Sequence, residues 1–323
     1  MIAMETRLQA FSGRCPIYAP SEGETEMQGN DTPTEGGKEY GGGAGGVGGE
    51  NGKLAGKGNV LYFWELFRKM FGTMARFKDR RSIRKYSRRG IPEGLIEALA
   101  GEASRAATMG NMQLYSLVVT EDGPEREALA AAHHHQPMVQ EAPAVLTFCA
   151  DFHRFSRWCE ERDAAPGYGN FVSFINAATD TLLFAQAFIT LAEECGLGTC
   201  ILGTTVYNPD KIIEALHLPS LVVPVLTVTL GWPDEAPEQT DRLPVEAILH
   251  AGHYHDYTAE DIDRIYAEKE ALPESRYFVE LNGTENLAQV FTRFRFTRQE
   301  CLEMSAKMRE VLKSQGFWEC KLR

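Results

Sequence analysis

The stretch that decides the fold spans residues 176–203 and reads NAATDTLLFAQAFITLAEECGLGTCILG. Residues 176–195 place apolar side chains over most of a helical surface, which is typical of a helix buried at the centre of a domain. Gly196 follows as a glycine helix cap. The apolar run 200–203 comes next and has the length of a short strand. The pattern therefore predicts a buried central helix that turns directly into a sheet.

Outward from this stretch, the chain alternates strand-like and helix-like segments. Strands are predicted over residues 112–120, 144–150 and 221–230, which are rich in β-branched and aromatic residues. Helices are predicted over 91–103, 125–132, 208–216, 259–271 and 299–314, with a polar loop between the last two. The helices vary in length and no GxGxxG follows the first strand, so the expected class is α+β and not a doubly wound dinucleotide-binding fold.

The N-terminal region differs in composition from the rest. Residues 1–58 hold half of the chain's 30 glycines and few apolar groups, which predicts a disordered extension, or a stretch outside the native product. Residues 59–75 form a short apolar and amphipathic segment, shorter than the roughly 20 residues that span a bilayer. For this segment we expect a short helix that packs on the body of the protein, in preference to a helix that lies in a membrane interface. Without a secretory signal, the expected compartment is the cytoplasm.

The net charge bears on the binding partners of the protein, and the spacing of the cysteines bears on whether they form disulfides. The formal net charge is -12 over 323 residues, so the body repels polyanions and nucleic acid is not an expected partner. The 7 cysteines have no CxxC spacing and no paired framework, which predicts free thiols that mostly fill the core.

Three segments suggest a site for an anionic ligand. Arg80, Ser82 and Arg84 combine paired guanidinium donors with a hydroxyl, a set that suits phosphate, although a solvated basic patch has the same composition. The glycines of 196–203 permit close backbone approach by a ligand, or simply make a tight turn between helix and strand. Arg242 follows the strand predicted at 221–230. Without the other two segments it would be interpreted as an ordinary surface arginine.

Together these segments resemble the FMN-dependent nitroreductase superfamily, and within it the oxygen-insensitive NADPH nitroreductase and flavin reductase subgroup. The resemblance covers about residues 76–318. It rests on the order and spacing of six motifs: 80–84 (RRSIR), 110–113 (GNMQ), 148–151 (FCAD), 196–203 (GLGTCILG), 230–233 (LGWP) and 242–244 (RLP). It implies a nitroreductase-like FMN-binding domain over 76–323, with a mostly antiparallel central sheet flanked by helices, in an intertwined homodimer.

The resemblance also implies roles for individual residues. Arg80, Ser82 and Arg242 would hold the FMN phosphate, and Arg84 would reach the ribityl chain and the N1/O2 edge of the flavin. Thr240 stands where many relatives have a second phosphate-binding lysine, so phosphate affinity would be either weaker or supplied by Arg81. The remaining positions would contact the flavin ring or its polar edges: Thr108, Gly110, Asn111, Gln136, Leu202, Gly203 and Thr204.

The implied activity is hydride transfer from NAD(P)H through flavin N5 to nitroaromatics, quinones or free flavin, in a ping-pong, two-electron mechanism. No catalytic side chain is expected, because the chemistry belongs to the flavin. Residues 280–289 lack an arginine for the 2′-phosphate of NADPH, so the choice between NADPH and NADH stays open. Two alternatives also stay open: a flavin enzyme of different chemistry, such as dehalogenation, and a flavin-binding module without activity.

Two other features are interpreted as structural. The triplet His133–His135 suggests metal, but adjacent residues do not share one helix face, so no metal is expected. Asp180, inside the apolar helix, is expected to be a buried carboxylate satisfied by hydrogen bonds, including one from a backbone donor.

Overall fold

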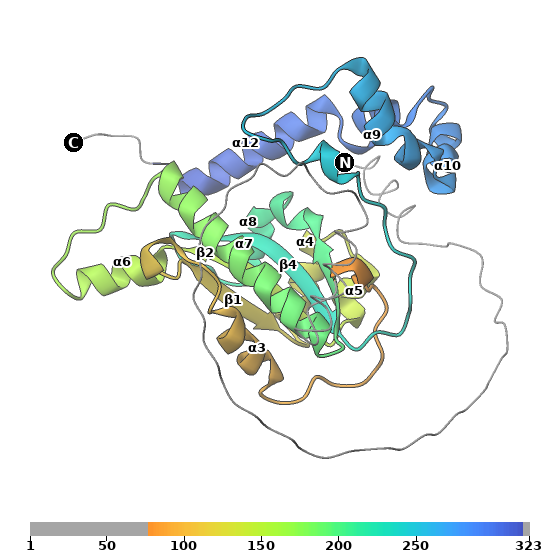
Figure 1. Cartoon of the computed structure of the whole chain (residues 1–323). Coiled ribbons are helices and arrows are strands. Elements are labelled where there is room, and N and C mark those ends of the chain that lie inside the picture. Colours follow the sequence, from red (N-terminus) through yellow and green to blue (C-terminus); the bar gives the residue numbers. More distant parts are fainter. Residues whose placement is uncertain (1–76, 319–323) are drawn as a thin grey trace, which may run out of the picture. The chain divides into compact units, whose positions relative to one another are not determined.

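The computed structural model describes residues 77–318. The predictions for residues 1–58 and 59–75 therefore lie outside the described residues. The described part is an α+β unit built on a four-stranded sheet with helices on both faces (Figure 1).

The strands are β1 (Tyr115–Thr120), β2 (Ala144–Asp151), β3 (Gly198–Leu202) and β4 (Val222–Gly231). Their order in the sheet is β1-β2-β4-β3, and each neighbouring pair is antiparallel. The expected α+β class with a mostly antiparallel sheet is confirmed. Because β3 is the last strand in this order, its outer edge is open to pairing by another segment.

The α-helices are α3 (Leu95–Ala103), α4 (Pro124–Ala132), α5 (Pro137–Glu141), α6 (His153–Glu160), α7 (Phe171–Glu194), α8 (Pro209–Ala215), α9 (Ala259–Ala271), α10 (Pro273–Asn282), α11 (Leu287–Val290) and α12 (Arg298–Ser314). Short 3-10 turns cover Phe77–Asp79, Met109–Asn111, Gly203–Val206 and Val245–Ala247, and one π-turn covers Phe291–Arg295.

The central helix α7 runs across one face of the sheet (Figure 1). Phe184 and Phe188 of α7 lie edge-on to Phe148 of β2, with ring centroids 5.7 and 5.8 Å apart. The length and hydropathy of α7 would also suit a membrane span, but 56% of its most apolar window is buried inside the protein. The core helix of a globular domain can have the same length and hydropathy. The contacts of α7 with the sheet identify α7 as a core helix.

Helices α4, α5 and α8 cover the opposite face, where Leu129, Val139, Val145 and Ile212 form a second apolar cluster. Arg126 of α4 is buried beside this cluster and donates hydrogen bonds to the carbonyl oxygens of residues 121, 139, 142 and 143. These bonds satisfy a charged group that would otherwise be costly to bury. They also tie α4, the end of α5 and the start of β2 together.

Most predicted elements agree with the structure to within a few residues, and three beginnings differ by three residues or more. Helix α3 starts at Leu95, after the predicted 91, and its N-cap Gly94 has φ of 76°. Helix α7 starts at Phe171, before the predicted 176, because the Asn170 side chain caps it by accepting from Ser173 N. Strand β1 starts at Tyr115, later than the predicted 112, because Asn111 and Gln113 adopt positive φ and keep that stretch in a turn.

The prediction of a polar loop between 271 and 299 is wrong. Helices α10 and α11 occupy most of that interval. Pro273 opens α10 at its first turn, and Gly283 ends it with φ of 58°, so the start and stop signals are present. Within α10 only Ser275 is buried, and the helix has 10 residues. So few turns give an apolar pattern little length over which to repeat.

Candidate functional site

Residues 80–84, which we call the arginine segment, lie along the outer edge of β3. Ser82 forms a parallel bridge with Thr199, and Ile83 N donates to Thr199 O at 2.9 Å. Ile83 is buried, whereas Arg81 and Arg84 are exposed. This pairing fixes the backbone of the segment on the sheet while its charged side chains remain available to a ligand.

Two carboxylates hold the arginine segment. Glu193, in the last turn of α7, lies 3.4 Å from Nε of Arg80. Glu235, after β4, accepts hydrogen bonds from the backbone N–H groups of Arg84 at 2.6 Å and Lys85 at 3.1 Å. Arg81 has a local partner instead, since it donates to the carbonyl oxygen of Asp79. Glu193 and Glu235 each contact donor groups of the arginine segment and thereby orient it.

The strand β3 leads from the arginine segment to residues 202–204, which are predicted to contact the flavin. Leu202 is buried at the end of β3, and Gly203 and Thr204 begin the 3-10 turn that follows. A Cβ added at Gly203 would meet no atom within 4 Å, so this face of the turn is open. Thr204 Oγ1 shares a hydrogen bond of 2.7 Å with Nδ1 of the buried His133. Gln136, three residues after His133, is half-buried and is the N-cap residue of α5.

The glycines of 196–203 have three different roles. Gly196, at φ of 83°, ends α7 as the predicted cap. Gly198 makes room for a side chain of this protein, since a Cβ there would lie 2.7 Å from Cβ of Ile83. Only Gly203 borders open space. The interpretation that all these glycines admit a ligand is therefore corrected: close approach to the arginine segment requires Gly198.

The turn that carries Thr108, Gly110 and Asn111 is organised by Asp180 of α7. This carboxylate accepts hydrogen bonds from Thr108 Oγ1 at 2.5 Å, Met109 N at 2.9 Å and Leu114 N at 3.2 Å. Asp180 is buried, so the prediction of a satisfied buried carboxylate is confirmed. Gly110 and Asn111 both have positive φ, at 53° and 56°.

Arg242 lies on an exposed segment that returns toward the arginine segment. Gln239 Nε2 donates to the carbonyl oxygen of Arg80 at 3.3 Å, and Arg242 follows three residues later. Arg242 itself donates to Thr240 Oγ1 at 2.8 Å. The contact of Gln239 brings the segment that carries Arg242 back to the arginine segment, while among the described residues the side chain of Arg242 itself bonds only to Thr240 and Asp241.

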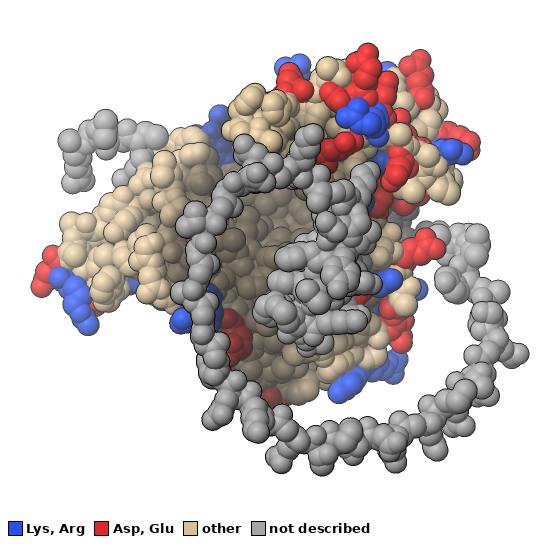
Figure 2. Space-filling view, in the orientation of Figure 1, with Lys and Arg blue, Asp and Glu red and all other residues tan. Residues whose placement is uncertain are grey.

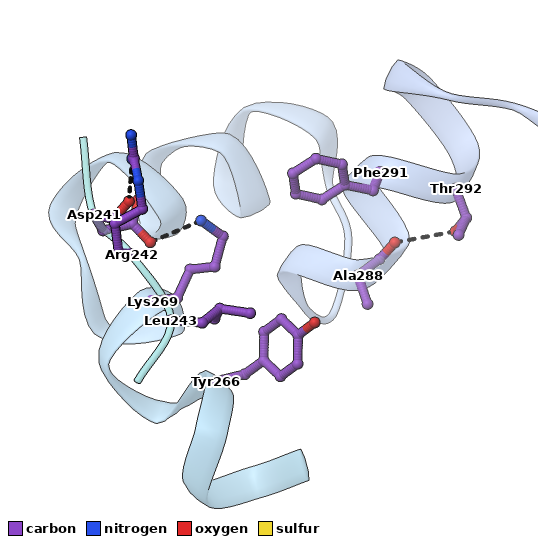
Figure 3. A pocket seen from close by; sticks show the side chains of 8 residues that line it. All are labelled: Asp241, Arg242, Leu243, Tyr266, Lys269, Ala288, Phe291 and Thr292. Carbon is purple, nitrogen blue, oxygen red and sulfur yellow. Dashed lines mark hydrogen bonds and ion pairs between the residues drawn. The ribbon is translucent and has the colours of Figure 1, made fainter. Parts of the chain in front are cut away.

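A pocket of about 550 Å³ adjoins Arg242 (Figure 3). Tyr266 and Phe291 supply aromatic walls, and Lys269 forms an ion pair of 2.8 Å with Asp241. The complete lining is Asp241, Arg242, Leu243, Tyr266, Lys269, Ala288, Phe291 and Thr292. The pocket offers apolar surfaces beside Arg242, and the charge of its lysine is neutralised by Asp241.

The predicted site residues fall into two groups. The arginine segment and residues 202–204 lie along β3, the segment of Arg242 joins them through Gln239, and His133 links Thr204 to the turn before Gln136. The turn with Thr108 is anchored at Asp180, thirteen residues before Glu193 on α7. At 1.5 Å per residue, these anchors are about 20 Å apart along the helix. One protomer therefore does not gather all the predicted residues at one point.

Sequence analysis missed Glu193 and Glu235. A signal for Glu193 exists, because an acid in the last turn of a helix opposes the helix dipole and needs a compensating cation. Glu235 has no such local signal. Within the described residues, no cluster of three His, Cys, Asp or Glu side chains could hold a metal ion. Of the free cysteines there, only Cys149 and Cys200 are buried, so the expectation that most thiols fill the core is wrong for this part of the chain.

The fold and this site define a nitroreductase-like α+β protein, and comparisons with known proteins agree. The Nitroreductase family model matches residues 77–232. The chain is 32% identical over 174 residues to an oxygen-insensitive NADPH nitroreductase of Salmonella typhimurium, covering 54% of this chain and 71% of that protein. It is 29% identical over 187 residues to an FMN reductase (NADPH) of Bacillus subtilis, covering 57% and 75%.

A crystal structure from Bacteroides fragilis NCTC 9343, assigned as an oxidoreductase, is also similar. It shares 58% identity and a TM-score of 0.75, and the match covers 76% of this chain and 100% of that one. The chain belongs to the nitroreductase family.

Proposed function

We propose that this chain is an FMN-dependent oxidoreductase that uses NAD(P)H to reduce electron-poor acceptors such as nitroaromatics, quinones or free flavin. The observation that carries the proposal is the arginine segment fixed on the edge of β3, beside the open turn at Gly203. Family membership and the reductase names of the relatives support the same class of reaction.

The residues present suit FMN. Arg80 and Arg242 offer cationic donors and Ser82 a hydroxyl, which is a donor set that suits a phosphate dianion. The carboxylates nearby are occupied by donors of the protein, so they do not leave free negative charge facing the ligand. Gly203 borders open space where a flat ring can approach the backbone.

When bound, the flavin would accept hydride from the nicotinamide and deliver it to the acceptor. The protein would supply position and electrostatics. Arg84, as a cation beside the N1/O2 edge, would stabilise negative charge there. The backbone of residues 202–204 would direct an N–H group toward N5, and His133 would keep that turn in place through Thr204. No side chain is needed as acid, base or nucleophile.

We further propose weak discrimination between NADPH and NADH. Lys269 is paired with Asp241, so the pocket beside Arg242 offers little net positive charge to a 2′-phosphate. Acidic side chains also gather over α9 and α10 (Figure 2). Neither feature supplies a cation that would favour the additional phosphate of NADPH over NADH.

We propose that the active form is a homodimer in the cytoplasm, with the flavin at the seam between protomers. Five apolar side chains of α7 are exposed in the single chain: Phe171, Val172, Ile175, Leu182 and Leu183. Uncharged surface extends over the N-terminal half of this helix (Figure 2). An exposed apolar stripe of this kind is typical of an interface. A second protomer would also bring another turn with Thr108 to the site.

The direct test is the visible spectrum of the purified protein before and after anaerobic NADPH or NADH, followed by turnover with a quinone. We expect flavin absorbance that decreases when either NADPH or NADH is added. The kcat/KM values for the two nicotinamides should differ by less than about tenfold. Reversing the charge of Arg80 and Arg84 together should remove the bound flavin. The matched control, Arg162→Glu with Lys211→Glu, reverses two exposed charges elsewhere and should retain it.

Each contrary outcome has a definite meaning. Colourless protein that does not take up added FMN would refute the proposal. Coloured protein that neither nicotinamide reduces would favour a flavin-binding module without reductase activity. Reduction by NADPH without turnover of quinones or nitroaromatics would favour other chemistry on the same cofactor.

A further inference from the structure

Glu193 occupies an unfavourable position for a carboxylate. It lies in the last turn of α7, where the helix dipole places partial negative charge, and no basic residue of that turn compensates it. It is also half-buried, and burial raises the pKa of Glu193 above its usual value, opposed by the Thr199 hydrogen bond and by Arg80. A carboxylate retained under these conditions needs specific partners.

Two partners come from the site. Thr199 Oγ1 donates to Glu193 at 2.5 Å, and Nε of Arg80 lies 3.4 Å from the same oxygen, Oε1. Thr199 is fully buried, and its backbone carbonyl accepts from Ile83 N of the arginine segment. The end of α7, the edge of β3 and the arginine segment therefore meet at one carboxylate.

The contact engages only one edge of the Arg80 guanidinium. Within residues 77–318, Nε makes the ion pair of Arg80, and its two terminal nitrogens have no protein acceptor. A guanidinium is planar and rigid, so holding Nε fixes the direction of the terminal pair of donors. That pair is the edge that matches two oxygens of a phosphate.

We propose that Glu193 is a positioning residue that orients Arg80 toward the phosphate of the ligand. The inference rests on the proposed function, because it takes FMN as the ligand. Preorganisation of this kind removes the entropy loss of ordering a long side chain on binding. Glu193 acts through Arg80 and touches neither the flavin ring nor the acceptor.

The test compares affinities of the full-length apoprotein for FMN and riboflavin, which differ only in the phosphate. In wild type, FMN should bind more tightly. Glu193→Ala and Arg80→Ala should each lower the ratio of riboflavin Kd to FMN Kd by about tenfold, with riboflavin affinity unchanged. Combining both substitutions should lower it no further than Arg80→Ala alone, because residues that act as a unit are not additive.

Three further variants separate positioning from a general structural role. Glu193→Gln keeps an oxygen that accepts from Thr199 and Arg80, so it should retain the ratio to within about threefold. Glu193→Met keeps side-chain volume without an acceptor and should match Glu193→Ala, which guards against loss of fold in the smaller variant. Glu194→Ala removes the exposed neighbouring acid and should leave the ratio unchanged.

A wild-type ratio in folded Glu193→Ala or Glu193→Met would overturn the inference. Multiplicative effects in the double variant would overturn it as well, since Glu193 would then act independently of Arg80. Equal wild-type affinities for FMN and riboflavin would show that no phosphate contact exists, which would refute the inference while leaving the flavin proposal intact. Failure to bind either compound would refute the proposed function itself.

Discussion

At the scale of single residues, His133 combines full burial with one hydrogen bond. Its Nδ1 is bonded to Thr204, while Nε2 has no partner among the described residues. Burial lowers the pKa of His133 to about 4, and the neighbouring His134 shifts it in the same direction. The folded protein therefore keeps this ring neutral at pH values where an unfolded histidine is protonated.

This difference predicts an acid-sensitive stability. Between about pH 6.5 and about pH 4 the unfolded chain binds a proton at His133 and the folded chain does not, so stability falls as the pH drops through this window. Lowering the pH from about 7.5 to about 5 should cost the wild type about 2 kcal/mol more than His133→Gln. Urea unfolding of both proteins at the two pH values gives the free energies of unfolding that test this difference.

The matched control for this measurement is His135→Gln. His135 belongs to the same triplet but is exposed, so its replacement should retain the pH dependence of the wild type. Equal losses of stability in the wild type and His133→Gln would contradict the assignment of a neutral, buried His133.

At the scale of elements, the pairing of the arginine segment with β3 depends on Gly198. We predict that Gly198→Ala destabilises the protein by about 1–3 kcal/mol, because the new methyl would overlap Ile83 and force the strands apart. The same displacement should weaken FMN binding. Thermal unfolding and a flavin titration measure the two effects.

Gly101 provides the comparison. It lies inside α3, and a Cβ there would meet no atom within 4 Å. Gly101→Ala should therefore leave flavin binding intact and keep or raise stability by up to about 1 kcal/mol. If Gly198→Ala were as stable and as tightly bound to FMN as Gly101→Ala, the close packing would not govern the site.

Local signals explain why many elements were predictable. The Thr258 and Thr297 capping boxes of α9 and α12 lie next to the residues that they stabilise. The helices missed between α9 and α12 show the limit, since α10 has 10 residues and α11 has 4, which leaves few turns over which a pattern can repeat.

At the scale of the whole molecule, the exposed apolar stripe of α7 predicts a dimer. Ile175→Glu with Leu182→Glu should give a monomer that loses bound flavin, because two charges would be buried without partners at the seam. Light scattering after size-exclusion chromatography should give twice the 36.0 kDa chain mass for wild type and the single mass for the variant.

A control for this experiment is Leu281→Glu, which places a charge on an exposed apolar position of α10. It should remain dimeric and retain flavin. A monomeric wild type that still holds FMN would contradict the proposed seam, because one protomer would then suffice for the site.

The sequence by itself determined the central helix with its glycine cap, most strands, the α+β class and the family, because these depend on periodicity, on neighbouring residues and on the spacing of short motifs. Only the tertiary structure decided that β3 is an edge strand, that Ile83 requires Gly198, and that Glu193 and Glu235 hold the arginine segment. Those contacts join residues more than a hundred positions apart, and their partners depend on the order of strands in the sheet, which no local pattern of side chains encodes.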